Sequence, residues 1–134
     1  MASIVDIEGV GAAYAAKLKA AGVATTEALL EAGATPKGRE ELAAKSGIDK
    51  GKVLEWVNHA DLFRIKGVGS EYSDLLEAAG VDSPAELAHR VAANLFQKLN
   101  EINAAKKLVR KMPTEAQVAK WVEEAKTLPK IVTH

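Results

Sequence analysis

The phrase Gly-Val-Gly occurs twice in this chain, each time before a stretch of helix-forming residues. Glycine adopts backbone angles that other residues resist, and it lets another group approach the main chain closely. The first amides of a helix have no partner within it, and a helix N-terminus attracts phosphate. The pattern therefore predicts anion binding at the two turns. The predicted phosphate-binding residues are Gly9, Val10, Gly11, Ala12, Gly67, Val68, Gly69 and Ser70.

The two turns belong to a longer internal repeat. Residues 7–29 match residues 65–87 at an offset of 58, with 11 identities. A second match, at an offset of 65, pairs Val53, Trp56, Val57 and Ala60 with Val118, Trp121, Val122 and Ala125. Its spacing is that of a buried helical stripe, so both tryptophans are interpreted as core residues. The offsets differ by seven, which predicts a duplication with about two helical turns inserted in the second half.

Composition and helix punctuation predict an all-α fold. The chain is 48% apolar but only 4% aromatic, so Ala, Leu, Val and Ile must form the core. Thr35 and Ser83, each followed by proline, are typical N-caps, and Ser83 and Thr114 have capping-box spacing. We predict helices at residues 11–21, 26–32, 36–46, 50–61, 69–79, 84–99, 102–111 and 115–127. The expected architecture is two pseudo-symmetric units, 1–64 and 65–134, packed as one compact domain.

Each glycine turn, with the Gly-Val that closes its helix at Gly22 and Gly80, resembles the helix-hairpin-helix motif. That motif is shared by repair polymerases, DNA glycosylases, ligases and the Holliday-junction branch-migration protein. From about Ile4 to Leu128 the chain is also similar to an uncharacterised bacterial family built from paired helix-hairpin-helix units. The residues that carry this closer resemblance are Thr35, Lys37, Gly38, Arg39, Leu42, Ala43, Trp56–Gly69, Leu75–Arg90, Trp121 and Val122. The resemblance implies the fold and, from the wider superfamily, contact with the DNA backbone through hairpin amides.

Charge distinguishes the two hairpins. DNA-binding hairpins commonly have Lys or Arg two residues after the second glycine, where this chain has Ala13 and Glu71. Glu71 is expected to repel a phosphate or to occupy the helix N-terminus itself. Residues 65–90 contain two basic and five acidic side chains, which favours a purely structural second turn. For the first turn, with Lys17 nearby, phosphate binding and a structural role both stay open.

A basic segment follows in the second half. Lys98, Lys106, Lys107, Arg110 and Lys111 stand against one acid, Glu101. On a helix over 102–111 they would form two i, i+4 pairs of like charge, with Leu108 and Val109 facing inward. Two interpretations are a solvated helical face and a ridge that contacts phosphate. A weaker basic cluster, diluted by acids, is Lys37, Arg39, Lys45, Lys50 and Lys52.

The sequence offers no catalytic set, metal site or cofactor motif. The chain has no cysteine, and Tyr14 stands where a dinucleotide fingerprint requires its third glycine. The three histidines are scattered, and His59 near Asp61 is interpreted as a surface hydrogen-bonding pair. No apolar run approaches 18 residues, which predicts a cytoplasmic protein without a membrane segment. The formal net charge is zero, and no small-molecule substrate is expected.

Two functions follow as hypotheses. The first is non-catalytic binding of the duplex DNA backbone, independent of sequence, through the hairpins and the basic segment. The alternative is a protein-interaction adaptor, in which the hairpins dock a protein partner or a second copy of the chain. Zero net charge and Glu71 favour the adaptor, whereas the usual use of the motif favours nucleic acid.

Overall fold

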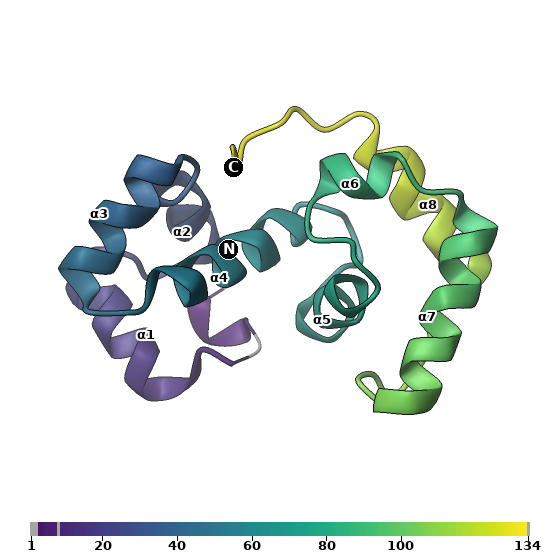
Figure 1. Cartoon of the computed structure of the whole chain (residues 1–134), viewed down its shortest axis with the longest axis horizontal. Helices are drawn as coiled ribbons and strands as arrows, with labels where there is room; N and C mark the ends of the chain where they lie inside the picture. The colour runs from purple at the N-terminus through teal and green to yellow at the C-terminus, as the bar shows by residue number, and fades with distance from the viewer. Residues whose placement is uncertain (1–2, 8, 134) are drawn as a thin grey trace. The chain divides into compact units, whose positions relative to one another are not determined.

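The computed structural model describes residues 3–7 and 9–133, and every regular element within them is a helix (Figure 1). The elements in chain order are η1 (Ile4–Asp6), α1 (Gly11–Ala20), α2 (Thr26–Ala32), α3 (Pro36–Ser46), α4 (Lys50–Leu62), α5 (Ser70–Ala78), α6 (Pro84–Ala88), α7 (Ala92–Lys106) and α8 (Glu115–Ala125). The predicted all-α class is confirmed. None of these helices has both the length and the apolar character needed to cross a membrane.

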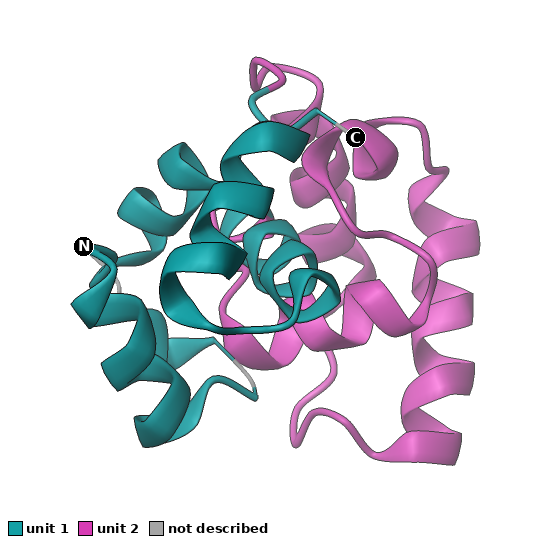
Figure 2. Ribbon diagram, turned by 60° about the vertical axis from the view of Figure 1, so that its left-hand side comes forward, with its two compact units in different colours: residues 1–61, 131–134 teal, residues 62–130 magenta. Residues whose placement is uncertain are grey.

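The chain divides into two compact units (Figure 2). Unit 1 comprises residues 1–61 and 131–134, and unit 2 comprises residues 62–130. The repeat places the division after residue 64, and it assigns the last residues to the second half. They join unit 1 because the Thr133 amide donates to the Ala34 carbonyl at 2.8 Å and Val132 is only 2% exposed.

In unit 1, η1 and α3 pack against α1, and α2 packs against α3. Trp56, on α4, is 3% exposed and meets the Tyr14 ring edge-on, with centroids 5.1 Å apart. The interpretation of Trp56 as a core residue is therefore confirmed. The other large buried apolar residues of this unit include Ile4, Ile7, Leu18, Leu29, Val53 and Val57.

In unit 2, α6 and α7 both pack against α8, and α5 packs against α7. Trp121, on α8, is 4% exposed and lies 5.2 Å from the Tyr72 ring, which confirms its predicted place in the core. Its neighbours in the same apolar cluster include Leu75, Leu76, Leu87, Leu95, Leu99, Val118 and Val122.

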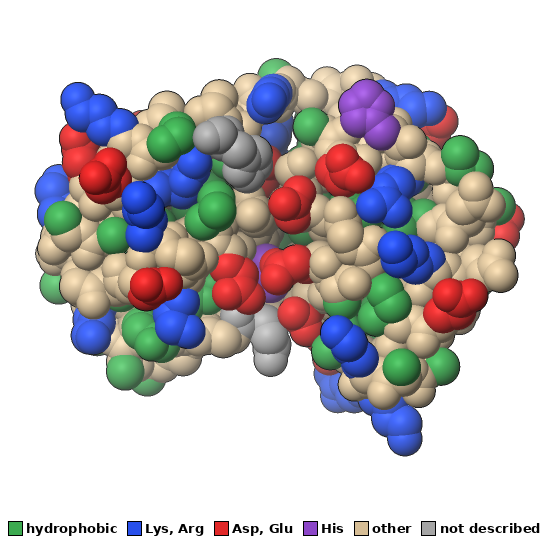
Figure 3. All heavy atoms as spheres, viewed as in Figure 1, with side chains coloured by type: hydrophobic (Ala, Val, Ile, Leu, Met, Phe, Trp, Pro, Cys, Tyr) green, Lys and Arg blue, Asp and Glu red, His purple; other side chains and the backbone are tan. Residues whose placement is uncertain are grey.

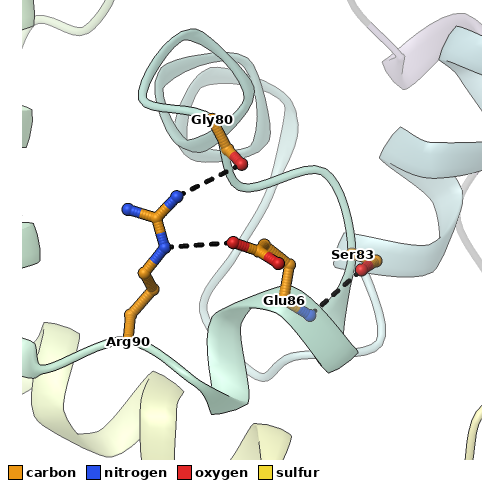
Figure 4. Close-up of polar contacts among 4 residues, drawn as sticks. All are labelled: Gly80, Ser83, Glu86 and Arg90. Atoms are coloured by element: carbon orange, nitrogen blue, oxygen red, sulfur yellow. Dashed lines mark hydrogen bonds and ion pairs between the residues drawn. The ribbon is translucent and has the colours of Figure 1, made fainter.

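Most of the predicted caps form. Thr35 and Ser83 accept hydrogen bonds from the first turns of α3 and α6, and Thr114 forms a complete capping box with Gln117. The predicted box at Ser83 is only half made. Glu86 donates its amide to Ser83, but its carboxylate accepts from Arg90 Nε at 3.2 Å (Figure 4). Arg90 Nη2 also donates to the Gly80 carbonyl at 3.4 Å, so Arg90 ties α6 to the end of α5.

The predicted helices over 84–99 and 102–111 are wrong. The chain breaks after Ala88, restarts as α7 at Ala92, continues through Lys106 and is irregular from 107 to 114. Val91, extended at φ −86° and ψ 121°, begins the new helix. On either side of the break, α6 and α7 both pack against α8. Lys107, in the left-handed region at φ 52°, ends α7.

Candidate functional site

The two glycine turns have closely similar backbones. Val10 and Val68 are buried, and their amides donate to the carbonyls three residues earlier, Ile7 and Ile65, at 3.2 and 3.1 Å. Gly9 and Gly67 have φ values of +89° and +88°, which favour glycine. The second glycines differ: Gly11 is at +61°, whereas Gly69 is at −109°.

Each turn lies beside the tryptophan of its own unit. A Cβ atom added at Gly9 would lie 3.8 Å from Trp56 Nε1, and one added at Gly67 would lie 3.4 Å from Trp121 Nε1. The turn, the tryptophan and the tyrosine that packs on it therefore form one local group in each unit. The group in unit 1 is Gly9, Trp56 and Tyr14, and that in unit 2 is Gly67, Trp121 and Tyr72.

The helices after both turns begin without a side-chain cap. The N-cap residues of α1 and α5 are Val10 and Gly69, and neither provides a side-chain hydrogen bond. Helices α2, α3, α6 and α8 are all capped by Thr or Ser, whereas α7 resembles α1 and α5 in this respect. Gly11 and Ala12, the first two residues of α1, are exposed, and the first amides of a helix have no partner within it.

The predicted basic residues are exposed but are not arranged as predicted. Lys17 lies on α1 in unit 1, and Lys98 lies on α7 in unit 2. Because α7 ends at Lys106, the expected i, i+4 pairs Lys106–Arg110 and Lys107–Lys111 do not lie on a helix. We call residues 107–111 the basic loop. Its inward residues are as predicted, since Val109 is 6% exposed and Leu108 packs against the core of unit 2.

Three side chains hold the basic loop beside the second glycine turn. The Tyr72 hydroxyl donates to the Lys111 carbonyl at 2.9 Å, and Arg110 Nε lies 3.4 Å from Glu71 Oε1. Asn103 accepts from the Val109 amide at 2.9 Å and donates to the Val109 carbonyl at 3.2 Å. Basic side chains gather at the same end of α7 in Figure 3, at the lower right. Glu71 therefore pairs with a cation at the surface of unit 2.

In unit 1, two lysines lie near the tyrosine that belongs to the first glycine turn. The ammonium groups of Lys17, on α1, and Lys52, on α4, each lie 5.8 Å from the centroid of the Tyr14 ring. Lys52 was not among the predicted site residues, although it belongs to the weaker basic cluster. The one sequence feature that could have drawn attention to Lys52 is its position directly before Val53, the first residue of the buried helical stripe.

Other polar groups of unit 1 have structural partners or are buried. His59 and Asp61 are 1% and 3% exposed, so the interpretation of this pair as surface residues is wrong. Arg39, 5% exposed, donates to the carbonyls of Gly33 and Thr133, each at 2.8 Å. Burial lowers the pKa of the Arg39 guanidinium. A pocket of about 220 Å³, which none of the predicted site residues lines, is formed by Pro36, Arg39, Glu40, Lys50, Gly51 and Leu54.

Comparison with protein families decides where this chain belongs. A family model described as a domain of unknown function, DUF4332, matches residues 8–128. The chain belongs to the DUF4332 family. The DUF4332 match covers both glycine turns and the basic loop. No curated protein and no solved structure matches the chain.

Proposed function

We propose that this DUF4332 chain is a non-catalytic, tandem helix-hairpin-helix protein that binds the backbone of duplex DNA in the cytoplasm without reading its sequence. The main contact is the second glycine turn together with the basic loop. The observation that supports the proposal is the attachment of that loop beside the start of α5, through Tyr72 and Arg110. The repeated group of glycine turn, tryptophan and tyrosine supports the two-hairpin assignment.

The charge balance at this contact is more favourable than the sequence alone indicates. Four of the six residues from 106 to 111 are basic and none is acidic. The Glu71 carboxylate is paired with Arg110, whose side chain is 93% exposed. An exposed ion pair of this kind contributes about 0–1 kcal/mol, so a phosphate can compete for the arginine.

The fixed loop also reduces the entropic cost of binding. Asn103 holds Val109 through both its amide and its carbonyl, and Tyr72 holds the carbonyl of Lys111. The loop backbone is therefore ordered before a ligand arrives, while the basic side chains remain exposed. Both tryptophans are buried, so neither indole is available for bases to stack on. This supports contact with phosphates and not with bases.

The experiment is a fluorescence-anisotropy titration of a labelled duplex at about 50 and 200 mM salt. We expect affinity to fall steeply with salt, and the double variant Lys107→Glu/Lys111→Glu to reduce the salt slope by about two. The matched control is Lys120→Glu/Lys130→Glu, which changes the net charge equally at exposed positions of the same unit.

Two outcomes contradict the proposal. One is a wild-type chain that does not bind duplex at the lower salt. The other is equal weakening by both double variants, since that would reflect net charge alone. The adaptor hypothesis gains support if DNA binding is absent and light scattering gives a mass well above that of one chain.

A further inference from the structure

A second polar group, in unit 1, contains a hydroxyl and two ammonium groups around one aromatic ring. We propose that Tyr14, Lys17 and Lys52 form a phosphate-binding subsite. As a contact for DNA phosphates, the subsite extends and rests on the proposed function. The ligand that its chemistry selects is a phosphate group, from either a nucleic-acid backbone or a free phosphate.

The two tyrosines of the chain make the same ring contact but use their hydroxyls differently. Tyr14 and Tyr72 each pack on the buried tryptophan of their own unit, at 5.1 and 5.2 Å. The Tyr72 hydroxyl donates to the Lys111 carbonyl, in the region where the second half has its seven-residue insertion. Unit 1 has no such insertion, and among the described residues no acceptor bonds the Tyr14 hydroxyl. Tyr14 therefore has a donor that is available to a ligand.

The two lysines add positive charge beside the Tyr14 ring. Each ammonium lies 5.8 Å from the Tyr14 ring centroid. Within the described residues, no carboxylate lies within ion-pair distance of either one. Tyr14 is half-buried, and an ammonium over a ring near the surface gains about 0.5–1 kcal/mol, which draws both lysines to the ring although they repel each other. An anion between them would remove that repulsion.

Two packed helices hold the group in place. Tyr14 and Lys17 are one turn apart on α1, and Lys52 and Trp56 are one turn apart on α4. Because Tyr14 packs on buried Trp56, the two helices keep Lys17 and Lys52 near the same ring. Trp56 also lies next to the Gly9 turn, so a phosphate at Tyr14 would lie near the exposed first amides of α1.

The two tryptophans of the chain, one in each unit, provide the readout. In a ¹⁵N-labelled sample their indole N–H groups give separate NMR signals. We expect inorganic phosphate to shift the Trp56 signal saturably, whereas sodium chloride of equal ionic strength should leave the Trp56 signal in place. A Trp56 signal that stays fixed, or that responds equally to chloride, overturns the proposal.

Variants test each member of the subsite. Tyr14→Phe and Lys52→Gln should each weaken phosphate binding about tenfold, since each removes a hydrogen bond to a charged ligand. The matched controls are Lys37→Gln and Lys45→Gln, which remove a lysine charge at exposed positions of α3. Equal effects of the variants and their controls contradict the subsite. Conservation of the indole spectrum without phosphate shows that each variant is folded.

A second arm identifies the source of the phosphate and separates this proposal from the proposed function. If duplex DNA shifts the Trp56 signal and Lys52→Gln weakens that response, the backbone phosphate is the ligand. If inorganic phosphate binds and duplex does not shift the signal, the subsite stands and takes a free phosphate. If duplex binds the chain while neither ligand shifts Trp56, the subsite fails and DNA binding through unit 2 remains.

Discussion

The hydroxyl of Tyr72 donates a hydrogen bond of 2.9 Å to the backbone carbonyl of Lys111, 39 residues further along the chain. This bond joins the helix that follows the second glycine turn to the most basic segment of the protein. The bond also distinguishes the roles of the two tyrosines in the repeat, because the Tyr14 hydroxyl has no equivalent partner in the described part of unit 1. A duplicated side chain thus anchors a loop in one unit and is available to a ligand in the other.

Replacing Tyr72 with Phe should loosen the basic loop while keeping the ring contact with Trp121. We expect a loss of about 0.5–1.5 kcal/mol in unfolding free energy and faster amide exchange over residues 107–111. Hydrogen-exchange mass spectrometry measures the second effect directly. Tyr14→Phe is the control and should change neither quantity. Unchanged exchange in the basic loop would show that Asn103 and Val109 hold it without Tyr72.

The first glycine of the second turn should be far less replaceable than the second glycine. Gly67 has φ +88° and Trp121 Nε1 would lie 3.4 Å from an added Cβ, so Gly67→Ala should cost about 1–2 kcal/mol. Gly69→Ala should leave the free energy of unfolding nearly unchanged. The φ of Gly69 is −109°, and no neighbouring atom would lie within 4 Å of the added Cβ. Thermal unfolding of the two variants measures the difference. Equal melting temperatures would contradict the turn geometry.

Lys107 and Lys106 permit a test that separates charge from backbone strain. Lys107→Gly should stabilise the protein by about 0.5–1 kcal/mol, because φ 52° strains a lysine and suits glycine. Lys106→Gly should destabilise it by a similar amount, since Lys106 is the last helical residue of α7. Both remove one positive charge, so both should weaken DNA binding. If Lys106→Gly weakens duplex binding and Lys107→Gly does not, affinity follows stability and not charge, which would count against phosphate contact at this loop.

Arg39 should be important for the stability of unit 1. It joins the carbonyls of Gly33 and Thr133, and Arg39→Lys keeps the charge but loses the planar fork that reaches both. We expect a loss of about 1–3 kcal/mol in a urea titration, against little change for exposed Lys37→Gln on the same helix. If Arg39→Lys leaves the urea midpoint of unfolding unchanged, a single donor at this position is enough to stabilise unit 1.

The pH dependence expected from Arg39 has a definite sign. Burial lowers the pKa of Arg39 in the folded state below its ordinary value, so the unfolded chain binds the proton more tightly. Stability contributed by this group therefore rises with pH only between the lowered folded pKa and the higher pKa of the unfolded chain. Since arginine stays protonated near neutrality, the loss caused by Arg39→Lys should be the same at pH 6 and pH 8. Unfolding titrations at both values check this.

Local signals predicted much of this fold, and long-range contacts account for what they missed. The caps at Thr35 and Thr114 follow from side chains that bond within one turn, and the shared spacing around Trp56 and Trp121 indicates burial. The break near Val91 has no glycine or proline to mark it, since it arises from the packing of both α6 and α7 on α8. The burial of His59 likewise depends on tertiary packing.

The candidate site divides in the same way. The exposed turns at Gly9–Ala12 follow from the repeated glycine phrase, because glycine spacing and helix-start amides are local properties. The position of the basic loop depends on the Tyr72–Lys111 bond, which no periodicity indicates. Lys52 becomes a neighbour of Tyr14 only because α4 packs Trp56 against α1.

The return of residues 131–133 to unit 1 has a consequence for the order of folding during synthesis. All of unit 2 leaves the ribosome before Val132 and Thr133 reach Ala34 and Arg39. The later unit in the sequence is therefore complete first, and the earlier unit waits for its last segment with a buried arginine that lacks one of its carbonyl partners. A chain truncated after residue 130 should contain a protease-resistant second unit beside a first unit that is more readily cleaved.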